Sequence, residues 1–412
     1  MKNKILLSVI LVVVGLTVIG CQKQRARVVA PEYDRPLAPG QLALRKITNP
    51  ADSPDFTDAC HNLTTLSAAI DNSLNYLKKP SSQRFFPYTD ISHEQVVRSL
   101  NAFKDMLNSG LTGRQLNDAI RQKFDVYESV GCDDAGTVLF TGYYTPIFDG
   151  TTTQTERFKY PLYRQPEDLV KEEDGKILGR KGPDGQVTPY PARAEIENSN
   201  MLAGKEIIWL DDPFKCYVAQ VQGSAIIRMS AEGETSLRGR SGPDGQLVTY
   251  GYAANNGHEY RSIIKELINE GKIPPDKVNL TALIDYFKGN SSLVRQYTQL
   301  NPRFVFFQRT TSAGPHGSLN EPVTAYRSIA TDKSIFPRAC LTFFATKLPR
   351  QIGGQTYIDP YSGFALDQDT GGAIRAAGRC DIYLGVGDEA GKLAGQTYQE
   401  GRLYYLFLKA GN

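Results

Sequence analysis

Two closely spaced runs stand near the C-terminus: Leu366-Asp367-Gln368-Asp369-Thr370-Gly371-Gly372-Ala373-Ile374 and Cys380-Asp381-Ile382-Tyr383-Leu384-Gly385-Val386-Gly387. Short apolar runs followed by glycines are typical of β-strands joined by tight turns. Asp369 and Asp381 lie 12 positions apart, each beside such a run. The pattern predicts two carboxylates held near one another on a rigid β scaffold. The alternative is that both are ordinary turn aspartates.

The composition describes a soluble globular chain. Its 412 residues are enough for two domains with sizeable cores, and it contains 41% hydrophobic and 22% charged residues. The 47 basic and 44 acidic residues give a net charge of only +3, which offers no electrostatic basis for binding nucleic acid. A neutral or mildly anionic polymer suits this balance better.

The N-terminus has the pattern of an export signal. Lys2 and Lys4 precede an apolar run over 5–19, so we predict a signal peptide over 1–20 rather than a spanning helix. Val18-Ile19-Gly20-Cys21 resembles a bacterial lipobox, in which Cys21 becomes the lipidated first residue. Because Asp is absent after it, we expect an outer-membrane lipoprotein facing the periplasm. Residues 21–57 are rich in Pro and Arg and predict a lipidated tether.

The remaining cysteines and histidines argue against a metal site. Excluding Cys21, five cysteines remain, and an odd number leaves at least one thiol unpaired. We predict a disulfide between Cys60 and Cys132. Because the chain has no C-x-x-C motif and only four histidines, we expect no zinc or other metal, and no cofactor.

Helical periodicity precedes strand-like alternation along the chain. Apolar spacing and capping residues predict helices over 58–79, 92–110 and 112–124. Alternation begins near 137, and strands are predicted over 207–210 and 214–222. Periodicity alone therefore indicates a mixed, β-rich chain with two bodies.

An ordered set of motifs resembles the membrane-bound lytic murein transglycosylase A family. The set covers roughly 85–409 and comprises Phe140-Thr141-Gly142-Tyr143-Tyr144-Thr145-Pro146, Tyr190-Pro191-Ala192-Arg193-Ala194-Glu195-Ile196, Val221-Gln222-Gly223-Ser224, Asn256-Gly257-His258-Glu259, Asn301-Pro302-Arg303-Phe304, Arg327-Ser328-Ile329-Ala330-Thr331-Asp332 and the two C-terminal runs. The resemblance implies a mainly β fold with attached helices. A double-psi six-stranded β-barrel, with its helices, would occupy 58–149 and 309–412. An inserted, β-rich, barrel-like substrate-groove domain would occupy 150–308.

The resemblance also implies the chemistry. Such enzymes cleave the β-1,4 bond between N-acetylmuramic acid and N-acetylglucosamine of peptidoglycan with one carboxylic acid, and form 1,6-anhydro-N-acetylmuramic acid. By motif, the catalytic acid falls on Asp381, with Asp369 as the alternative. Asp369 and Asp332 fall on companion aspartates, although capping a turn is an equal alternative for both. The other matched substrate-binding or supporting positions are Tyr144, Thr145, Gln222, Gly223, Ser224, Gly371 and Gly372.

Two other functions remain open at this point. One is a non-catalytic barrel that binds cell-wall polysaccharide. The other is a hydrolytic muramidase in which Asp369 and Asp381 act as paired carboxylates. The expected partners are peptidoglycan glycan strands and, through the lipid anchor, a membrane; the sequence does not identify protein partners.

Overall fold

Strand β3 and five strands from the C-terminal part of the chain close into a barrel in the computed structural model, which describes residues 31–172, 175–232, 245–274, 280–310 and 314–411. The hydrogen-bonded order is β17-β14-β15-β13-β16-β3, and β3 also pairs with β17, which completes the circle. The strands are β3 (Val138–Thr145), β13 (Ser328–Ala330), β14 (Leu341–Ile352), β15 (Gln355–Asp369), β16 (Arg379–Val386) and β17 (Tyr398–Leu408). This closure confirms the predicted six-stranded barrel.

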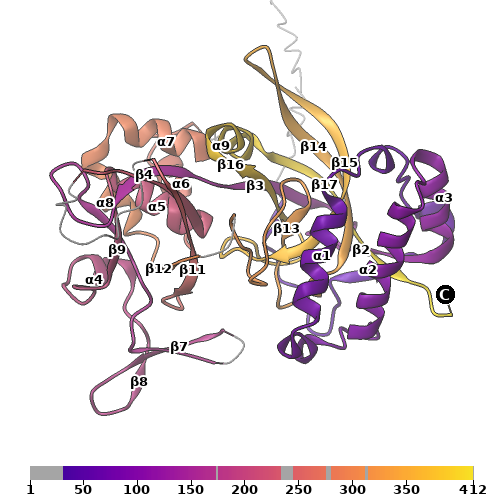
Figure 1. The fold of residues 1–412 in the computed structure, drawn as a ribbon, viewed down its shortest axis with the longest axis horizontal. Helices are drawn as coiled ribbons and strands as arrows, with labels where there is room; N and C mark the ends of the chain where they lie inside the picture. Colours follow the sequence, from indigo (N-terminus) through magenta and orange to yellow (C-terminus); the bar gives the residue numbers. More distant parts are fainter. Residues whose placement is uncertain (1–30, 173–174, 233–244, 275–279, 311–313, 412) are drawn as a thin grey trace, which may run out of the picture. The chain divides into compact units, whose positions relative to one another are not determined.

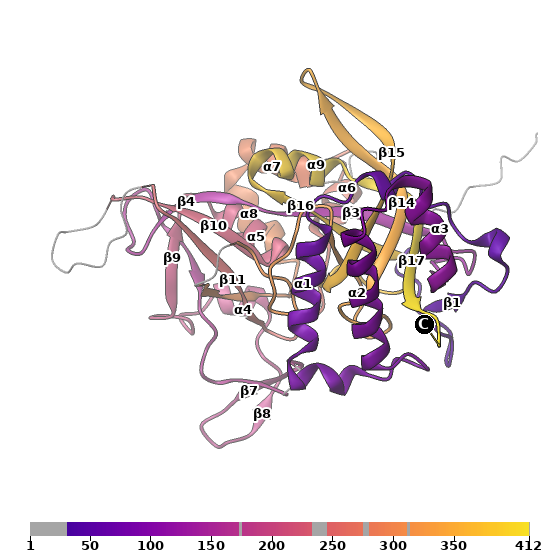
Figure 2. The ribbon, with the colours of Figure 1, turned by 45° about the vertical axis from the view of Figure 1, so that its right-hand side comes forward.

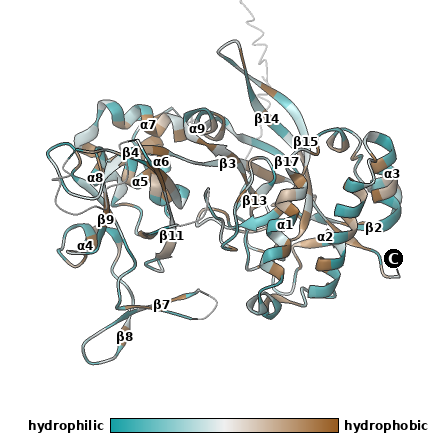
Figure 3. Ribbon diagram, viewed as in Figure 1, coloured by the Kyte–Doolittle hydropathy of each residue, from teal (hydrophilic) through white to brown (hydrophobic). Residues whose placement is uncertain are grey.

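Helices and two further strands surround the barrel. Strands β2 (Phe124–Ser129) and β1 (Leu44–Lys46) extend its sheet from β17. The helices α1 (Leu66–Leu77) and α2 (His93–Asn108) lie side by side against it, with α3 (Gly113–Lys123) beside them (Figures 1 and 2). Each carries both apolar and polar stretches, as the brown and teal segments in Figure 3 show. They bury their apolar side chains in the same core as the barrel strands.

The predicted tether differs from the structure over its second half. Strand β1 pairs with β2, and Phe56 is fully buried in the barrel core. Apolar side chains at Ala43, Leu44 and Phe56 supply enough buried surface to hold this segment on the fold. The predicted signal peptide and Cys21 lie outside the described residues. The first helix is also shorter than predicted, because a 3₁₀ turn over Ala59–His61 precedes α1.

A second sheet is inserted between β3 and β13, within the same unit, Glu32–Asn412. Its order is β12-β11-β10-β4-β9-β5, and a bridge between Arg164 and Phe307 brings its two edges together. The strands are β4 (Ile147–Thr151), β5 (Tyr160–Tyr163), β9 (Glu206–Leu210), β10 (Ser224–Met229), β11 (Leu247–Asn255) and β12 (Val305–Arg309). A small third sheet contains β6 (Leu169–Lys171), β7 (Ile177–Lys181) and β8 (Val187–Thr188).

One of the predicted strands of the insert is a helix. The segment predicted as a strand over 214–222 forms α5 (Pro213–Gln222). Asp212 caps its first turn by accepting hydrogen bonds from Phe214 N at 2.6 Å and Lys215 N at 3.3 Å. Gly223 ends it with a φ of +77°, so the Asp-Pro start and the glycine stop outweigh the apolar pattern. The described residues of the insert also form the α-helices α4 (Arg193–Glu197), α6 (Ile263–Asn269), α7 (Leu280–Gly289) and α8 (Val294–Thr298).

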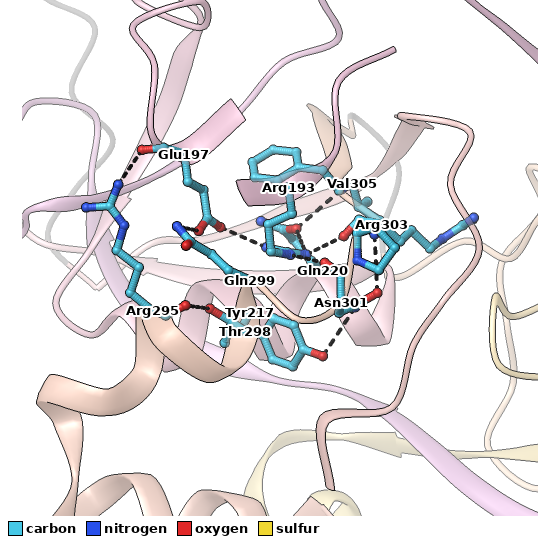
Figure 4. Close-up of polar contacts among 12 residues, drawn as sticks. Arg193, Glu197, Tyr217, Gln220, Arg295, Thr298, Gln299, Asn301, Arg303 and Val305 are labelled. Carbon is cyan, nitrogen blue, oxygen red and sulfur yellow. Dashed lines mark hydrogen bonds and ion pairs between the residues drawn. The ribbon is translucent and has the colours of Figure 1, made fainter. Parts of the chain in front are cut away.

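A buried arginine ties the insert together. Arg193 is 2% exposed and donates to Gln220 Oε1 at 2.7 Å, Asn301 O at 3.1 Å and Arg303 O at 2.6 Å (Figure 4). It also pairs with Glu197 at 3.0 Å. These contacts join α4, α5 and the segment that leads into β12.

The predicted disulfide is wrong, because the cysteines at 60, 132, 216, 340 and 380 are all free thiols. Cys60 lies in the 3₁₀ turn that packs against α3 and β15. Cys132 instead lies beside Gly378, in a different part of the fold.

A buried ion pair joins the segment after β13 to β15. Lys333 pairs with Asp367, whose side chain is fully buried and also accepts from Thr331 Oγ1 at 2.7 Å and Tyr405 OH at 2.6 Å. Burial lowers the pKa of Lys333. Removing one member of such a pair leaves an uncompensated charge in a low dielectric.

We therefore expect Lys333→Met to lower the free energy of unfolding by about 3–5 kcal/mol. Lys392→Met is the matched control, since the ion pair of Lys392 with Glu389 is exposed and contributes little to stability. Urea unfolding monitored by circular dichroism measures both. Equal losses in the two variants would contradict a structural role for the buried pair.

Candidate active site

Ala330 on strand β13 lies between two aspartates, one on each neighbouring strand. Ala330 pairs with Asp369 on the parallel strand β15 and with Asp381 on the antiparallel strand β16. Neighbouring strands are about 4.8 Å apart, so these two residues stand two ladder steps apart, roughly 10 Å. The two carboxylates predicted to lie close together on a β scaffold are therefore flanking neighbours of β13.

Asp381 has the least satisfied carboxylate of the group. Its Oδ1 is buried and has no hydrogen-bond partner among the described residues. Burial, with a smaller contribution from the negative charge of Asp369, raises the pKa of Asp381 to about 6, although Arg379 and a hydrogen bond with Thr141 act in the opposite direction. Desolvation outweighs the cation because a bare carboxylate away from water is costly. A carboxylic acid with a pKa near 6 can still hold its proton at mildly acidic to neutral pH.

Asp369 is better supplied with donors. Its Oδ1 accepts from the backbone N–H groups of Ser318 and Thr370, both at 2.8 Å, and its Oδ2 accepts from Tyr143 OH at 2.9 Å. Burial raises the pKa of Asp369, and these three donors lower it. Because hydrogen bonds to the charged form favour ionisation, Asp369 is the more anionic of the pair.

Asp332 holds a turn together. Its Oδ1 accepts from Ser334 N at 3.1 Å and Ser334 Oγ at 2.6 Å, and its Oδ2 accepts from Ala376 N at 2.9 Å. It is 6% exposed, and Ala376 has a φ of +64°. These contacts agree with the turn-capping alternative and link β13 to the loop that precedes β16.

The tyrosine that reaches Asp369 is Tyr143, next to the motif position Tyr144. Tyr143 is half-buried, and its ring lies 5.1 Å from that of Tyr383. Tyr144 is 6% exposed and packs so closely on α9 (Gly387–Gln396) that a Cβ on Gly391 would lie 2.8 Å from its ring. Strand alternation places these neighbours on opposite faces. Tyr144 thus supports the strand, and Tyr143 faces the aspartates.

A chain of polar contacts links the barrel to the insert. Thr145 Oγ1 lies 3.1 Å from Tyr383 OH and 3.3 Å from Ser224 Oγ, while Gln222 Oε1 accepts from Tyr144 N at 2.9 Å. Thr145 and Ser224 are buried, so their hydroxyls position the two bodies. Gln222 and Gly223 are half-buried at the C-terminal end of α5.

The paired glycines belong to the same neighbourhood. Gly371 and Gly372 are half-buried in the loop after Asp369, and a Cβ on Gly372 would lie 3.0 Å from Nε of Arg303 in the insert. A side chain at 372 would have to displace that arginine. The sequence assigns no such role to Arg303, Thr141 or Tyr143. Strand register reveals the positions of Thr141 and Tyr143, and loop packing reveals that of Arg303.

The coupling between the two aspartates can be measured directly. We expect Asp369→Asn to lower the pKa of Asp381 from about 6, because the substitution removes a negative charge that disfavours the ionised acid. Arg379→Met should shift the same pKa upward, since it removes a favourable cation. NMR titration of the carboxyl carbon shift in ¹³C-aspartate-labelled protein measures the pKa of Asp381 in both variants. Shifts of the same sign in the two variants would contradict this electrostatic arrangement.

Comparison with known families and structures places this geometry among described proteins. The family model "MltA specific insert domain" matches residues 139–308, and the "3D domain" model matches 327–407. The membrane-bound lytic murein transglycosylase A of Escherichia coli K12 is 30% identical over 309 residues, 74% of each chain. The protein of the same name from Vibrio cholerae is 29% identical over 282 residues, 68% of each chain.

Solved structures agree on the fold. A membrane-bound lytic murein transglycosylase from Agrobacterium tumefaciens superposes with a TM-score of 0.71 at 22% identity, covering 89% of this chain and 98% of that one. E. coli MltA with bound chitohexaose superposes with a TM-score of 0.65 at 26% identity, covering 92% and 96%.

Proposed function

The chain belongs to the membrane-bound lytic murein transglycosylase A family, and from that premise we propose that Asp381 is the single acid and base of its reaction. Like its relatives, it is a lytic transglycosylase that cleaves peptidoglycan. One observation carries the choice of Asp381. Among the aspartates gathered at β13, only Asp381 has both a pKa raised to about 6 and a buried oxygen without a hydrogen-bond partner in the part of the chain described.

The reaction needs one proton, donated and then recovered. Protonated Asp381 gives its proton to the oxygen that links N-acetylmuramic acid to N-acetylglucosamine, and that C–O bond breaks. The C6 hydroxyl of the muramyl residue attacks its own C1 and passes its proton to the Asp381 carboxylate. The product is a 1,6-anhydro ring, no water is consumed, and the acid is restored.

The neighbouring groups support this cycle in distinct ways. Asp369, kept anionic by its three donors, favours the protonated form of Asp381. The hydroxyl of the half-buried Tyr143 donates to Asp369 at 2.9 Å. We propose that Gln222, Gly223 and the glycines at 371 and 372 leave room for the glycan backbone between barrel and insert. The chitohexaose bound to E. coli MltA supports a groove for a β-linked sugar chain. We retain 150–308 as the proposed substrate-groove domain.

We expect Asp381→Asn to reduce the release of 1,6-anhydro-muramyl products by about 10²–10⁴-fold, because the amide can neither donate nor recover the proton. Mass spectrometry of products from purified peptidoglycan measures this. Asp359→Asn, in the exposed turn-side part of β15, is the matched control and should retain the wild-type rate. The wild-type rate should fall as pH rises through the pKa of Asp381, since only the protonated acid acts.

The products also separate the competing functions. Undiminished release of anhydro sugars by Asp381→Asn would refute the proposal. Reducing-end products that require both Asp369 and Asp381 would favour the hydrolase. Binding without cleavage by the wild-type protein would favour the non-catalytic barrel.

The family name associates the chain with the cell envelope. No helix within the described residues is long and apolar enough to span a bilayer. We propose that attachment occurs through a lipid on Cys21, which would make the protein an outer-membrane lipoprotein facing the periplasm.

We expect Cys21→Ser to move the protein from the membrane fraction to the soluble fraction, because a serine cannot carry the thioether-linked lipid. Cell fractionation followed by mass spectrometry of the mature N-terminus measures this. A variant that stays in the outer-membrane fraction would contradict lipid anchoring at this position.

A further inference from the structure

A hollow of about 340 Å³ lies on the outer face of the barrel and has no role in the reaction described above. Its lining comes from the N-terminal segment and three barrel strands: Tyr33, Leu139, Lys347, Tyr398, Gln399 and Glu400. The strands involved are β3, β14 and β17, and β16 with Asp381 is the other neighbour of β3 (Figure 1).

The strand register places this hollow on the same face as Asp381. Asp381 pairs with Thr141 across the β16–β3 ladder, and Thr141 pairs with Tyr398 across the β3–β17 ladder. Residues directly opposite one another share a face of the sheet. Tyr398, which is 45% exposed, therefore stands on the outer face two ladder steps from Asp381, roughly 10 Å away.

A second row of residues, one pleat away, forms the floor of the hollow. Arg379 pairs with Leu139, which in turn pairs with Glu400. On the other side of β17, the ladder that joins Ala345 to Arg402 brings Lys347 alongside Glu400, and the neighbouring Thr346 Oγ1 donates to Glu400 O at 3.0 Å.

The N-terminal segment forms one wall. Tyr33 OH donates to Glu400 Oε1 at 2.7 Å, which holds this carboxylate in the hollow. The next residue, Asp34, pairs with Arg379 at 3.1 Å. These two contacts attach the N-terminal segment to β17 and β16, the strands that carry Glu400 and Arg379.

The lining chemistry is complementary to an amino acid or short peptide. Lys347 presents an exposed ammonium, and Glu400 a carboxylate with one oxygen beyond the bond to Tyr33. Such a set can bind both a carboxylate and an ammonium, and the phenol rings of Tyr33 and Tyr398 add apolar contact surface. An unsubstituted sugar carries no charge that would use Lys347 and Glu400 together.

We propose that this hollow binds the peptide stem carried by the muramyl residue that is being cleaved. The proposal rests on the function proposed above, since attack by the C6 hydroxyl on C1 requires a muramyl residue at Asp381. The stem leaves from the lactyl group of that same sugar. An extended peptide spans at most about 3.3–3.6 Å per residue, so roughly three stem residues cover the distance from Asp381 to Tyr398.

The test compares two substrates with the full-length protein. One is peptide-bearing glycan strands, and the other is the same strands after an amidase has removed the peptides. We expect Lys347→Glu to raise KM for the peptide-bearing strands about tenfold, because it replaces an attractive charge with a repulsive one. Its KM for stripped strands should equal that of the wild type. Tyr398→Ala should also raise KM for the peptide-bearing strands relative to KM for the stripped strands.

The controls separate this proposal from the proposed reaction. Lys123→Glu, an exposed lysine at the end of α3, should change neither KM. Asp381→Asn should slow cleavage of both substrates by about 10²–10⁴-fold, and its result tests the reaction alone. Equal effects of Lys347→Glu on both substrates, or no effect on either, would overturn the stem-binding hollow whatever the result at Asp381. Thermal unfolding of each variant verifies that the fold is retained.

Discussion

The pairing of Ala330 with both Asp369 and Asp381 is the constraint on which the site depends. Strand β13 has only three residues, yet it is the link that places β15 parallel to it and β16 antiparallel. Without that short strand, the two carboxylates would lie on strands that do not share a neighbour. The barrel core and the buried pair of Lys333 with Asp367 hold β13 and β15 in this register.

Four aspartates lie close together around β13, but their carboxylates differ in the hydrogen bonds and ion pairs that they make. Asp367 is neutralised by Lys333, Asp332 is bonded to the turn before β16, and Asp369 accepts three hydrogen bonds. Asp381 retains a buried oxygen that nothing in the described structure satisfies. At Asp381, hydrogen bonds and ion pairs offset the effect of desolvation least. Asp381 is therefore the aspartate of this group best able to hold a proton.

Much of this arrangement was predictable from the sequence. The glycine-flanked aspartates and the ordered motifs predicted the barrel and the two carboxylates. Helical periodicity predicted α1, α2 and α3, although the short strand β1 precedes them. Strand register was not predictable, because it depends on which distant segments pair, so the sequence directed attention to Tyr144 although Tyr143 contacts Asp369. Segment 214–222 was misassigned because its apolar residues resemble a buried strand, while the decisive cap at Asp212 lies just before it. Segment 43–56 was misassigned because its few buried side chains are scattered among prolines and polar residues.

The interrupted barrel has a consequence for biosynthesis. Strand β3 emerges early from the ribosome, but its partners β16 and β17 are among the last segments made, after the whole insert. Pairings between such distant segments carry a large loop-closure entropy and form late. In a nascent or truncated chain, β16 and its Asp381 are not yet in place beside β3. The active site can therefore form only when synthesis is complete.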